Sequence, residues 1–363
     1  MKQIVKRSAQ GAASGLDHMD NPSAETSDKP SQAAAAPAAE LTILTVGIEK
    51  HYEYIRRQIE MIDALNPGAA YRFIAVDNAF GASPGLVLDD PRCTVLAGVD
   101  PAPLPEEGRG SYHHAAALNM ALPRVQTRYA LILDPDLYVV YRNWIADCLD
   151  HMRRRDLSFF GVPWHSRWYM KWRGFPCVHF MLIDLAKAPA AGLDFTPRLV
   201  EDHRKDDTPL SAWMKTHAPV LHTRLQLGTR RDTGWSLQRR FGRGRDVDLA
   251  LPVVDLDNEL TKPRHLQSDR GRWLERRVPL RWRFLPPDGD YVDPADAPGL
   301  QGAALRSLEP ERFVWRGAPF AFHLRGVVRE EVWGRTKQGA EHQALPAILD
   351  RIMQSPTWLE WNL

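Results

Sequence analysis

The sequence predicts an α/β fold with a mostly parallel sheet that is covered by helices on both faces. Short apolar runs alternate with segments of helical periodicity between residues 41 and 185, and three of the runs end in glycine or acidic residues. Continuous apolar runs are typical of strands buried on both faces, and alternation of strands with helices is typical of parallel sheets. With 363 residues, 44% of them hydrophobic, the chain is long enough for a large core.

The first elements are the clearest. Residues 41–46 form an apolar, β-branched run that ends at Gly47, and we expect a buried strand there. Residues 50–65 have apolar side chains at helical spacing, and a Pro-Gly pair directly afterwards ends this helix. Residues 71–76 predict a second strand, and a third is expected around residues 93–96.

The same alternation continues to residue 183. We expect a helix over residues 111–122, which stops before a proline, and then an apolar strand over residues 129–133. Residues 143–154 predict an amphipathic helix. Two further strands are expected at residues 157–162 and 178–183.

The C-terminal region is elaborated and less regular. Short helices are expected at residues 209–216 and 233–241, whereas residues 258–312 are rich in Pro, Arg and Trp without periodicity. A strand at residues 320–324 and a closing helix at residues 344–353 complete the expected fold.

Composition divides the chain into three parts. Residues 1–40 are rich in Ala, Ser and Pro and cannot bury enough apolar area to offset the entropy of ordering, so we expect a disordered tail. Residues 41–335 are expected to form one large domain, and residues 336–363 a helical extension.

Charge and cysteine usage indicate the compartment and the partners. Residues 222–283 hold 15 Lys/Arg against 8 Asp/Glu, which favours anionic partners such as diphosphates or an acidic membrane face. No nucleic-acid recognition motif accompanies this charge, so no nucleic acid is expected. Neither a secretory signal nor a membrane span is expected, and the three cysteines form no zinc or disulfide pattern. We therefore expect a cytoplasmic protein that can contact the inner face of an anionic membrane peripherally.

The strand at residues 129–133 runs directly into Asp134-Pro135-Asp136. In extended chain, carboxylates at i and i+2 leave the same face, and Pro135 favours an extended Asp134. Carboxylate oxygens are suited to Mg²⁺ or Mn²⁺ that also holds phosphate oxygens. The alternative is a simple turn, because Asp-Pro is a common turn dipeptide.

Residues 41–185 resemble a family 2 glycosyltransferase with the GT-A fold. The resemblance rests on three segments in order: a strand ending in Asp77-Asn78, a helix containing Asn119, and a strand ending in Asp-x-Asp. It implies transfer of a sugar from a nucleotide-diphosphate donor, inversion at the sugar, and dependence on Mn²⁺ or Mg²⁺. Asp77 would then hydrogen-bond the base of the donor, Asn119 would lie at the donor site, Asp134 would bind the ribose or metal, and Asp136 the metal.

The resemblance also implies a catalytic base about a hundred residues further on. Asp232, in an Asp-Thr-Gly-Trp segment, fits best, although an Asp before a helix is also a common N-cap. Asp207 and the pair Glu201-Asp202 are alternatives. His323 after the last apolar strand resembles a third, C-terminal metal ligand of GT-A enzymes, the alternative being a structural histidine.

Two other groups are ambiguous. Adjacent histidines His113 and His114 point about 100° apart on a helix, so they would not share a metal; one could face the donor or both could be solvated. Aromatic and basic residues gather between residues 164 and 173, which suits stacking on a sugar acceptor, contact with a membrane interface, or plain packing.

Other enzyme classes fit poorly. Residues 81–85 match G-x-S-x-G, but the residue after the serine is Pro84, which lacks the N–H that an oxyanion hole needs. Gly47 is followed by no second glycine, which excludes the dinucleotide fingerprint and the glycine-rich loop of a sugar-nucleotide pyrophosphorylase. The remaining alternative to the enzyme is a catalytically inactive member of the same fold that binds nucleotide or glycan.

Overall fold

The computed structural model describes the residues of one unit between Ala38 and Leu363. The described ranges are residues 38–79, 85–168, 171–200, 208–218, 221, 230–242, 244–255, 268–278, 290–297, 299–324, 331–332, 335–336 and 339–361. The expected tail therefore lies almost wholly outside the described residues. Its disorder, and the expected boundary at residue 335, stay predictions.

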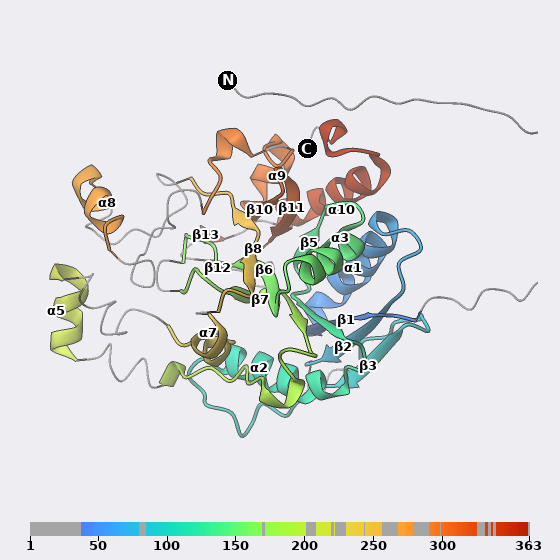
Figure 1. The fold of residues 1–363 in the computed structure, drawn as a ribbon, viewed down its shortest axis with the longest axis horizontal. Helices are drawn as coiled ribbons and strands as arrows, with labels where there is room; N and C mark the ends of the chain where they lie inside the picture. Colours follow the sequence, from blue (N-terminus) through green and yellow to red (C-terminus); the bar gives the residue numbers. More distant parts are fainter. Residues whose placement is uncertain are drawn as a thin grey trace, which may run out of the picture. The chain divides into compact units, whose positions relative to one another are not determined.

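A sheet of seven strands forms the centre of this unit (Figure 1). Its order is β3-β2-β1-β4-β7-β6-β8, and four of the six neighbouring pairs are parallel. The strands are β1 Leu41–Gly47, β2 Tyr71–Asp77, β3 Cys93–Ala97, β4 Tyr129–Leu133, β6 Phe159–Pro163, β7 Pro176–Asp184 and β8 Val247–Leu249. The predicted mostly parallel sheet is confirmed, and β7 is antiparallel to both of its neighbours because a loop without a crossover helix joins it to β6.

Helices cover both faces of this sheet, as predicted. In Figure 1, α2 (Arg109–Ala121) lies on one side of the strands, and α1 (Tyr52–Leu65) and α3 (Trp144–Arg154) lie on the other. α1 buries a stripe of side chains at helical spacing that includes Ile55 and Ile62, which is the pattern that the sequence showed.

A second, antiparallel sheet lies beside the first and was only partly predicted. Its order is β5-β11-β10-β9, with β5 at Leu137–Val139, β11 at Ala318–His323, β10 at Glu311–Trp315 and β9 at Leu251–Pro252. β11 confirms the expected late strand. β5 and β10 were not expected, because β5 has only three residues and β10 begins with two charged residues, Glu311 and Arg312, that are buried here.

The C-terminal helix α10 (Gly339–Gln354) is longer than the expected 344–353. Its apolar side chains join a core cluster that also receives Met61 and Leu65 from α1 and Phe322 from β11. The end of the chain is thus packed against the beginning of the fold.

The remaining elements are short. They are α5 Pro209–His217, α7 Trp235–Phe241, α8 Asp269–Glu275, α9 Ala303–Ser307, β12 Glu331–Val332, β13 Arg335–Thr336 and the 3-10 helices Glu49–His51, Leu122–Arg124, Ala190–Gly192, Pro294–Asp296 and Trp358–Glu360. α5 and α7 confirm the two short helices expected after residue 190. Among the described residues, no helix combines the length and apolarity that crossing a bilayer requires.

The strand order reverses between β1 and β4, which are parallel neighbours. Gly47 and Asp77 are paired at the ends of β1 and β2, and β4 ends at Leu133, immediately before Asp134. In open α/β sheets, ligands bind outside the carboxyl ends of the strands at such a reversal. The acidic residues that the sequence singled out therefore lie at the edge where a ligand site is expected.

Candidate functional site

The Asp134-Pro135-Asp136 segment is a turn whose backbone is fixed from three sides. The Asp134 N–H donates to the His179 carbonyl on β7 at 2.9 Å, and the Leu137 N–H donates to the Asp134 carbonyl at 3.1 Å. The Gln58 side chain of α1 donates to the carbonyls of Asp134 and Leu137, both at 2.8 Å. Both carboxylates are largely buried. The motif is thus a turn, and the same turn places two carboxylates at the edge of the sheet.

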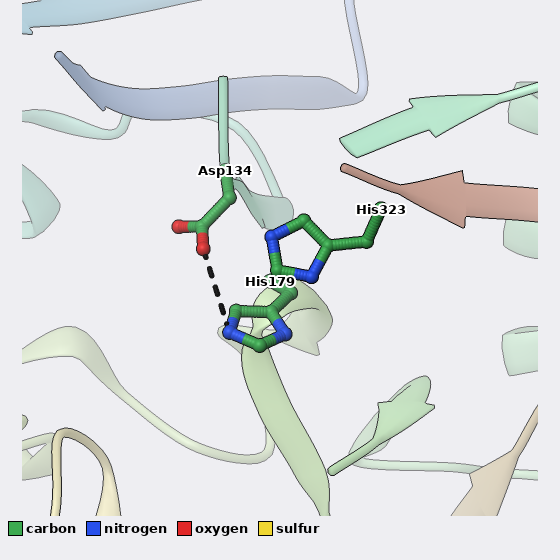
Figure 2. Close-up of side chains that lie close together, drawn as sticks. All are labelled: Asp134, His179 and His323. Atoms are coloured by element: carbon green, nitrogen blue, oxygen red, sulfur yellow. Dashed lines mark ion pairs between the residues drawn. The ribbon is translucent and has the colours of Figure 1, made fainter. Parts of the chain in front are cut away.

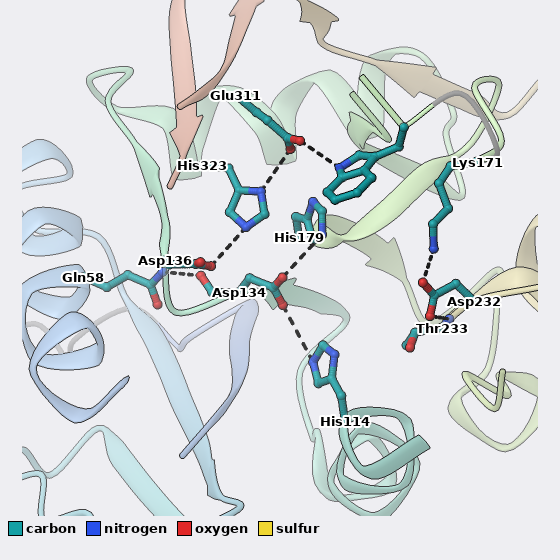
Figure 3. A network of polar contacts seen from close by, with 11 residues as sticks. Gln58, His114, Asp134, Asp136, Lys171, His179, Asp232, Thr233, Glu311 and His323 are labelled. Carbon is teal, nitrogen blue, oxygen red and sulfur yellow. Dashed lines mark hydrogen bonds and ion pairs between the residues drawn. The ribbon is translucent and has the colours of Figure 1, made fainter. Parts of the chain in front are cut away.

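Asp136 is joined to His323 by the second sheet. Leu137 of β5 pairs with His323 of β11, and the Leu324 N–H donates to the Asp136 carbonyl at 3.0 Å. His323 Nε2 lies 3.0 Å from Asp136 Oδ1, and its Nδ1 lies 3.1 Å from Glu311 Oε2. Figure 3 shows this chain of contacts. The two residues, which are far apart in the sequence, are thus in direct contact, and their role as metal ligands stays a prediction.

Glu311 was not singled out from the sequence. It is fully buried on β10, and its second oxygen accepts a hydrogen bond from the Trp168 indole at 2.9 Å. A carboxylate behind a histidine fixes the orientation of the ring and raises its basicity, as behind many metal-bound histidines. Glu311 therefore lies where it can fix the orientation of the His323 ring.

His179 is a further site residue that the sequence analysis missed. It lies on β7 beside Asp134, with Nε2 at 3.6 Å from Asp134 Oδ2, and its ring centroid is 4.1 Å from that of His323. One ligand atom from each of Asp134, His179 and His323 fits within 4.8 Å of the others, and Figure 2 shows the three side chains converging. The available signal was a lone imidazole within an apolar strand whose nine residues are all buried.

This donor set suits a divalent transition metal. Two imidazoles with one or two carboxylates fit Mn²⁺ better than Mg²⁺, which prefers oxygen ligands. The predicted ligands Asp134, Asp136 and His323 are all present at this point, and His179 adds a fourth candidate.

The pKa values of Asp134, Asp136 and His323 are shifted in different directions. Burial and the neighbouring Asp136 raise the pKa of Asp134 to about 8. Burial would also raise the pKa of Asp136, but the charge and hydrogen bond of His323 outweigh it and lower that pKa to about 2. Burial would lower the pKa of His323, but its carboxylate partners, Asp136 first and then Glu311, raise it to about 10. The imidazolium of His323 therefore balances the carboxylates where a metal ion would bind.

His114 of α2 faces the same carboxylates. Its Nε2 lies 3.7 Å from Asp134 Oδ1, and burial lowers the pKa of His114 to about 4, so the ring is neutral at pH 7. His113 turns away, with Nε2 at 2.7 Å from the Val99 carbonyl oxygen. The two adjacent histidines diverge, as the helical geometry predicted, and His114 is the one at the site (Figure 3).

Asp232 lies in a turn before α7 and forms a buried ion pair with Lys171. The N-cap of α7 is Gly234, in the left-handed conformation, so Asp232 is not the cap of this helix. Burial would raise the pKa of Asp232, but the Lys171 ammonium outweighs it and lowers that pKa to about 2. The alternatives Asp207, Asp202 and Glu201 lie outside the described residues.

Lys171 lies between Asp232 and the candidate metal ligands. Its ammonium lies 4.3 Å from the centre of the Trp164 ring, and the Trp164 and His179 rings are 4.6 Å apart. The Asp232 charge also acts on His114. Asp232 is therefore connected to the Asp134 cluster through the side chains of Lys171, Trp164 and His179.

Asp77 and Asn119 are held by protein groups. Asp77 accepts hydrogen bonds from the Tyr52 hydroxyl at 2.7 Å and from the N–H groups of Leu86 and Ala79 at 2.8 and 3.2 Å. A carboxylate has about four lone-pair positions, so capacity for a ligand remains. The Asn119 amide bonds the segment 194–196 through both of its ends. Their expected contacts with a donor stay predictions.

No known protein family matches the sequence, and no curated protein matches it. Solved structures are similar at low identity. The mannosyltransferase PcManGT from Pyrobaculum calidifontis, in complex with GDP-Man and Mn²⁺, is 12% identical over 44% of this chain and 48% of that one, with a TM-score of 0.30. The galactosyltransferase LgtC, with donor and acceptor sugar analogues, is 14% identical over 58% and 73%, with a TM-score of 0.34.

The glycosyltransferase GlyE of Streptococcus pneumoniae TIGR4 is 12% identical over 61% of this chain and 47% of that one, with a TM-score of 0.32. The matched part thus spans about half the length of PcManGT and of GlyE. The strand pairing in this chain defines the mostly parallel α/β sheet, and the geometry of its side chains defines the candidate site.

Proposed function

We propose that the protein is a metal-dependent glycosyltransferase that uses a nucleotide-diphosphate sugar. The observation that carries this proposal is the cluster of Asp134, Asp136, His179 and His323 at the carboxyl edge of the sheet, where the strand order reverses. The resemblance of residues 41–185 to family 2 glycosyltransferases supports the same reaction class.

In this proposal Asp136 and His323 hold the metal, with Asp134 and His179 completing the set. When bound, Mn²⁺ or Mg²⁺ would neutralise the charge that develops on the leaving diphosphate. Glu311 keeps His323 in one orientation, and Gln58 keeps the two carboxylates in place from behind the turn.

Asp232 is the proposed base of an inverting transfer. An acceptor hydroxyl oxygen bonds the anomeric carbon as the bond from that carbon to the diphosphate breaks, and Asp232 receives the hydroxyl proton. A carboxylate with a pKa of about 2 is a weak base at pH 7. The reaction therefore requires Lys171 to leave Asp232, and the anionic diphosphate is the group that would attract its ammonium.

The Lys171–Asp232 pair also favours a second candidate function. A carboxylate held by a buried ammonium is what a structural ion pair looks like, and an inactive member of the fold that only binds a nucleotide or glycan would retain it. The two candidates differ in turnover and share donor binding.

The test begins with thermal shifts of the full chain by UDP- and GDP-sugars with and without Mn²⁺, followed by measurement of released nucleoside diphosphate. We expect Asp136→Asn to abolish metal-dependent donor binding, and Asp232→Asn to bind the donor without transfer. Equal loss of binding in both variants would refute this division of roles. Binding without any product in the wild type would favour the inactive candidate, and no shift with any donor would contradict both.

A further inference from the structure

Helix α8 (Asp269–Glu275) exposes apolar side chains and buries a charged one, which is the opposite of the usual arrangement. The Trp273 and Leu274 side chains are 53% and 49% exposed, whereas Glu275 is fully buried. A helix held by its apolar face would bury the first two and expose the third. Packing among the described residues therefore does not explain the outward apolar residues of α8.

The buried Glu275 of α8 interacts electrostatically with the loop between β6 and β7. Glu275 acts on the charge of Arg173, which donates to the carbonyls of Trp164, His165, Ser166 and Trp168. These carbonyls belong to the loop between β6 and β7 that also carries Lys171. α8 is thus connected through Glu275 and Arg173 to the loop that also carries Lys171.

The surface around Trp273 is cationic. The segment 268–278 contains four arginines and two acidic residues, and of the acidic residues Glu275 is buried and Asp269 pairs with Arg272. Arg270 is exposed, and the Arg277 guanidinium lies 3.4 Å from the centre of the Trp273 ring. The segment 268–278 therefore exposes apolar and cationic side chains next to one another.

A second helix repeats this arrangement in part. On α5 (Pro209–His217), Leu210 is 65% and Trp213 is 56% exposed, while Ser211 and Met214 face inward. Among the described residues, two tryptophans are exposed, and they are Trp213 on α5 and Trp273 on α8. Figure 1 shows both helices at the end of the molecule away from β3.

We infer that the exposed faces of α8 and α5 dock on an anionic lipid bilayer. Tryptophan rings favour the boundary between headgroups and acyl chains, and short helices with apolar and arginine side chains lie in that plane. Arginines at such a surface are attracted by anionic lipid. This combination favours a bilayer over a protein partner, whose contact would match the arginines with acidic side chains. The inference does not depend on sugar transfer.

Co-sedimentation with vesicles tests this docking in the absence of nucleotide and metal. The full chain is expected to sediment with vesicles of phosphatidylcholine and phosphatidylglycerol, and to stay in solution with phosphatidylcholine alone or in high salt. The paired change Trp273→Ser with Leu274→Ser should weaken binding at least about tenfold, and so should Arg270→Glu with Arg277→Glu. Exposed positions are chosen so that melting temperatures stay unchanged.

Matched controls are available at other exposed positions. Leu359→Ser and Val87→Ser remove side chains that are 73% and 67% exposed, and Arg154→Glu reverses an exposed charge on α3; all three should bind like the wild type. Failure of the wild type to sediment with anionic vesicles would overturn the inference, and so would equal loss in the controls. If the Trp273 and Leu274 changes instead convert a dimer to a monomer without altering vesicle binding, the face is a protein interface and the inference is wrong.

Discussion

Replacing Asp232 by asparagine tests the energetics of the buried ion pair directly. The change leaves the Lys171 ammonium in place without its counter-charge, while burial already lowers the pKa of that lysine. The pKa of Asp232 is about 2 in the folded chain, against about 3.9 for an ordinary aspartate, and this difference corresponds to about 2–3 kcal/mol. Removing one partner of a buried pair costs about 3–5 kcal/mol. We therefore expect Asp232→Asn to lower the free energy of unfolding by about 3 kcal/mol at pH 7.

Urea unfolding followed by tryptophan fluorescence measures this loss. The double change Lys171→Met with Asp232→Asn removes both charges and should recover most of the lost stability, because no uncompensated charge remains. Asp150→Asn is the matched control, since it breaks an exposed pair with Arg154 and should cost less than about 1 kcal/mol.

Two results would refute the reasoning: a loss below about 1 kcal/mol in Asp232→Asn, or a double variant that is as unstable as the sum of its single changes. The same variants also serve as folding controls for the test of glycosyl transfer. A folded Lys171→Met/Asp232→Asn chain without transfer would separate loss of the base from loss of the fold.

Three further predictions concern the metal, pH and the tail. Glu311→Gln should weaken Mn²⁺ affinity about 10- to 100-fold in a titration followed by thermal shift, and unchanged affinity would show that Glu311 does not support His323. Because the folded-state pKa of Asp232 is depressed, its contribution to stability is present above about pH 4 and is lost toward about pH 2. Between about pH 4 and 2, the free energy of unfolding of the wild type should therefore fall more steeply than that of Asp232→Asn, and parallel curves would contradict this. Deleting residues 1–36 should change the melting temperature by less than about 2 °C, whereas a large drop would place the tail in the fold.

The sheet could be predicted from the sequence because its strands are local, apolar and regularly separated by helices. The acidic turn after β4 was visible for the same reason: it follows an unmistakable strand. Asp136 and His323 were both singled out by resemblance, and the structure brings them to 3.0 Å. Their meeting was not derivable from spacing, because it depends on the pairing of β5 with β11.

The residues that were missed share one property. His179 and Glu311 lie inside strands, where a single polar residue changes the apolar pattern little, and each becomes meaningful only through neighbours far along the chain. β10 was missed because its buried charges, Glu311 and Arg312, resemble a polar loop in sequence. Such contacts are tertiary and leave no local periodicity.

The register between β5 and β11 has a consequence for biosynthesis. During translation, the Asp-Pro-Asp turn leaves the ribosome long before His323, which follows it by 187 positions. A nascent chain that has completed the large sheet still lacks this imidazole and the strand that carries it. The proposed metal site is thus complete only when nearly the whole polypeptide has been made. A product that terminates between β8 and β11 carries Asp134, Asp136 and His179 but lacks His323.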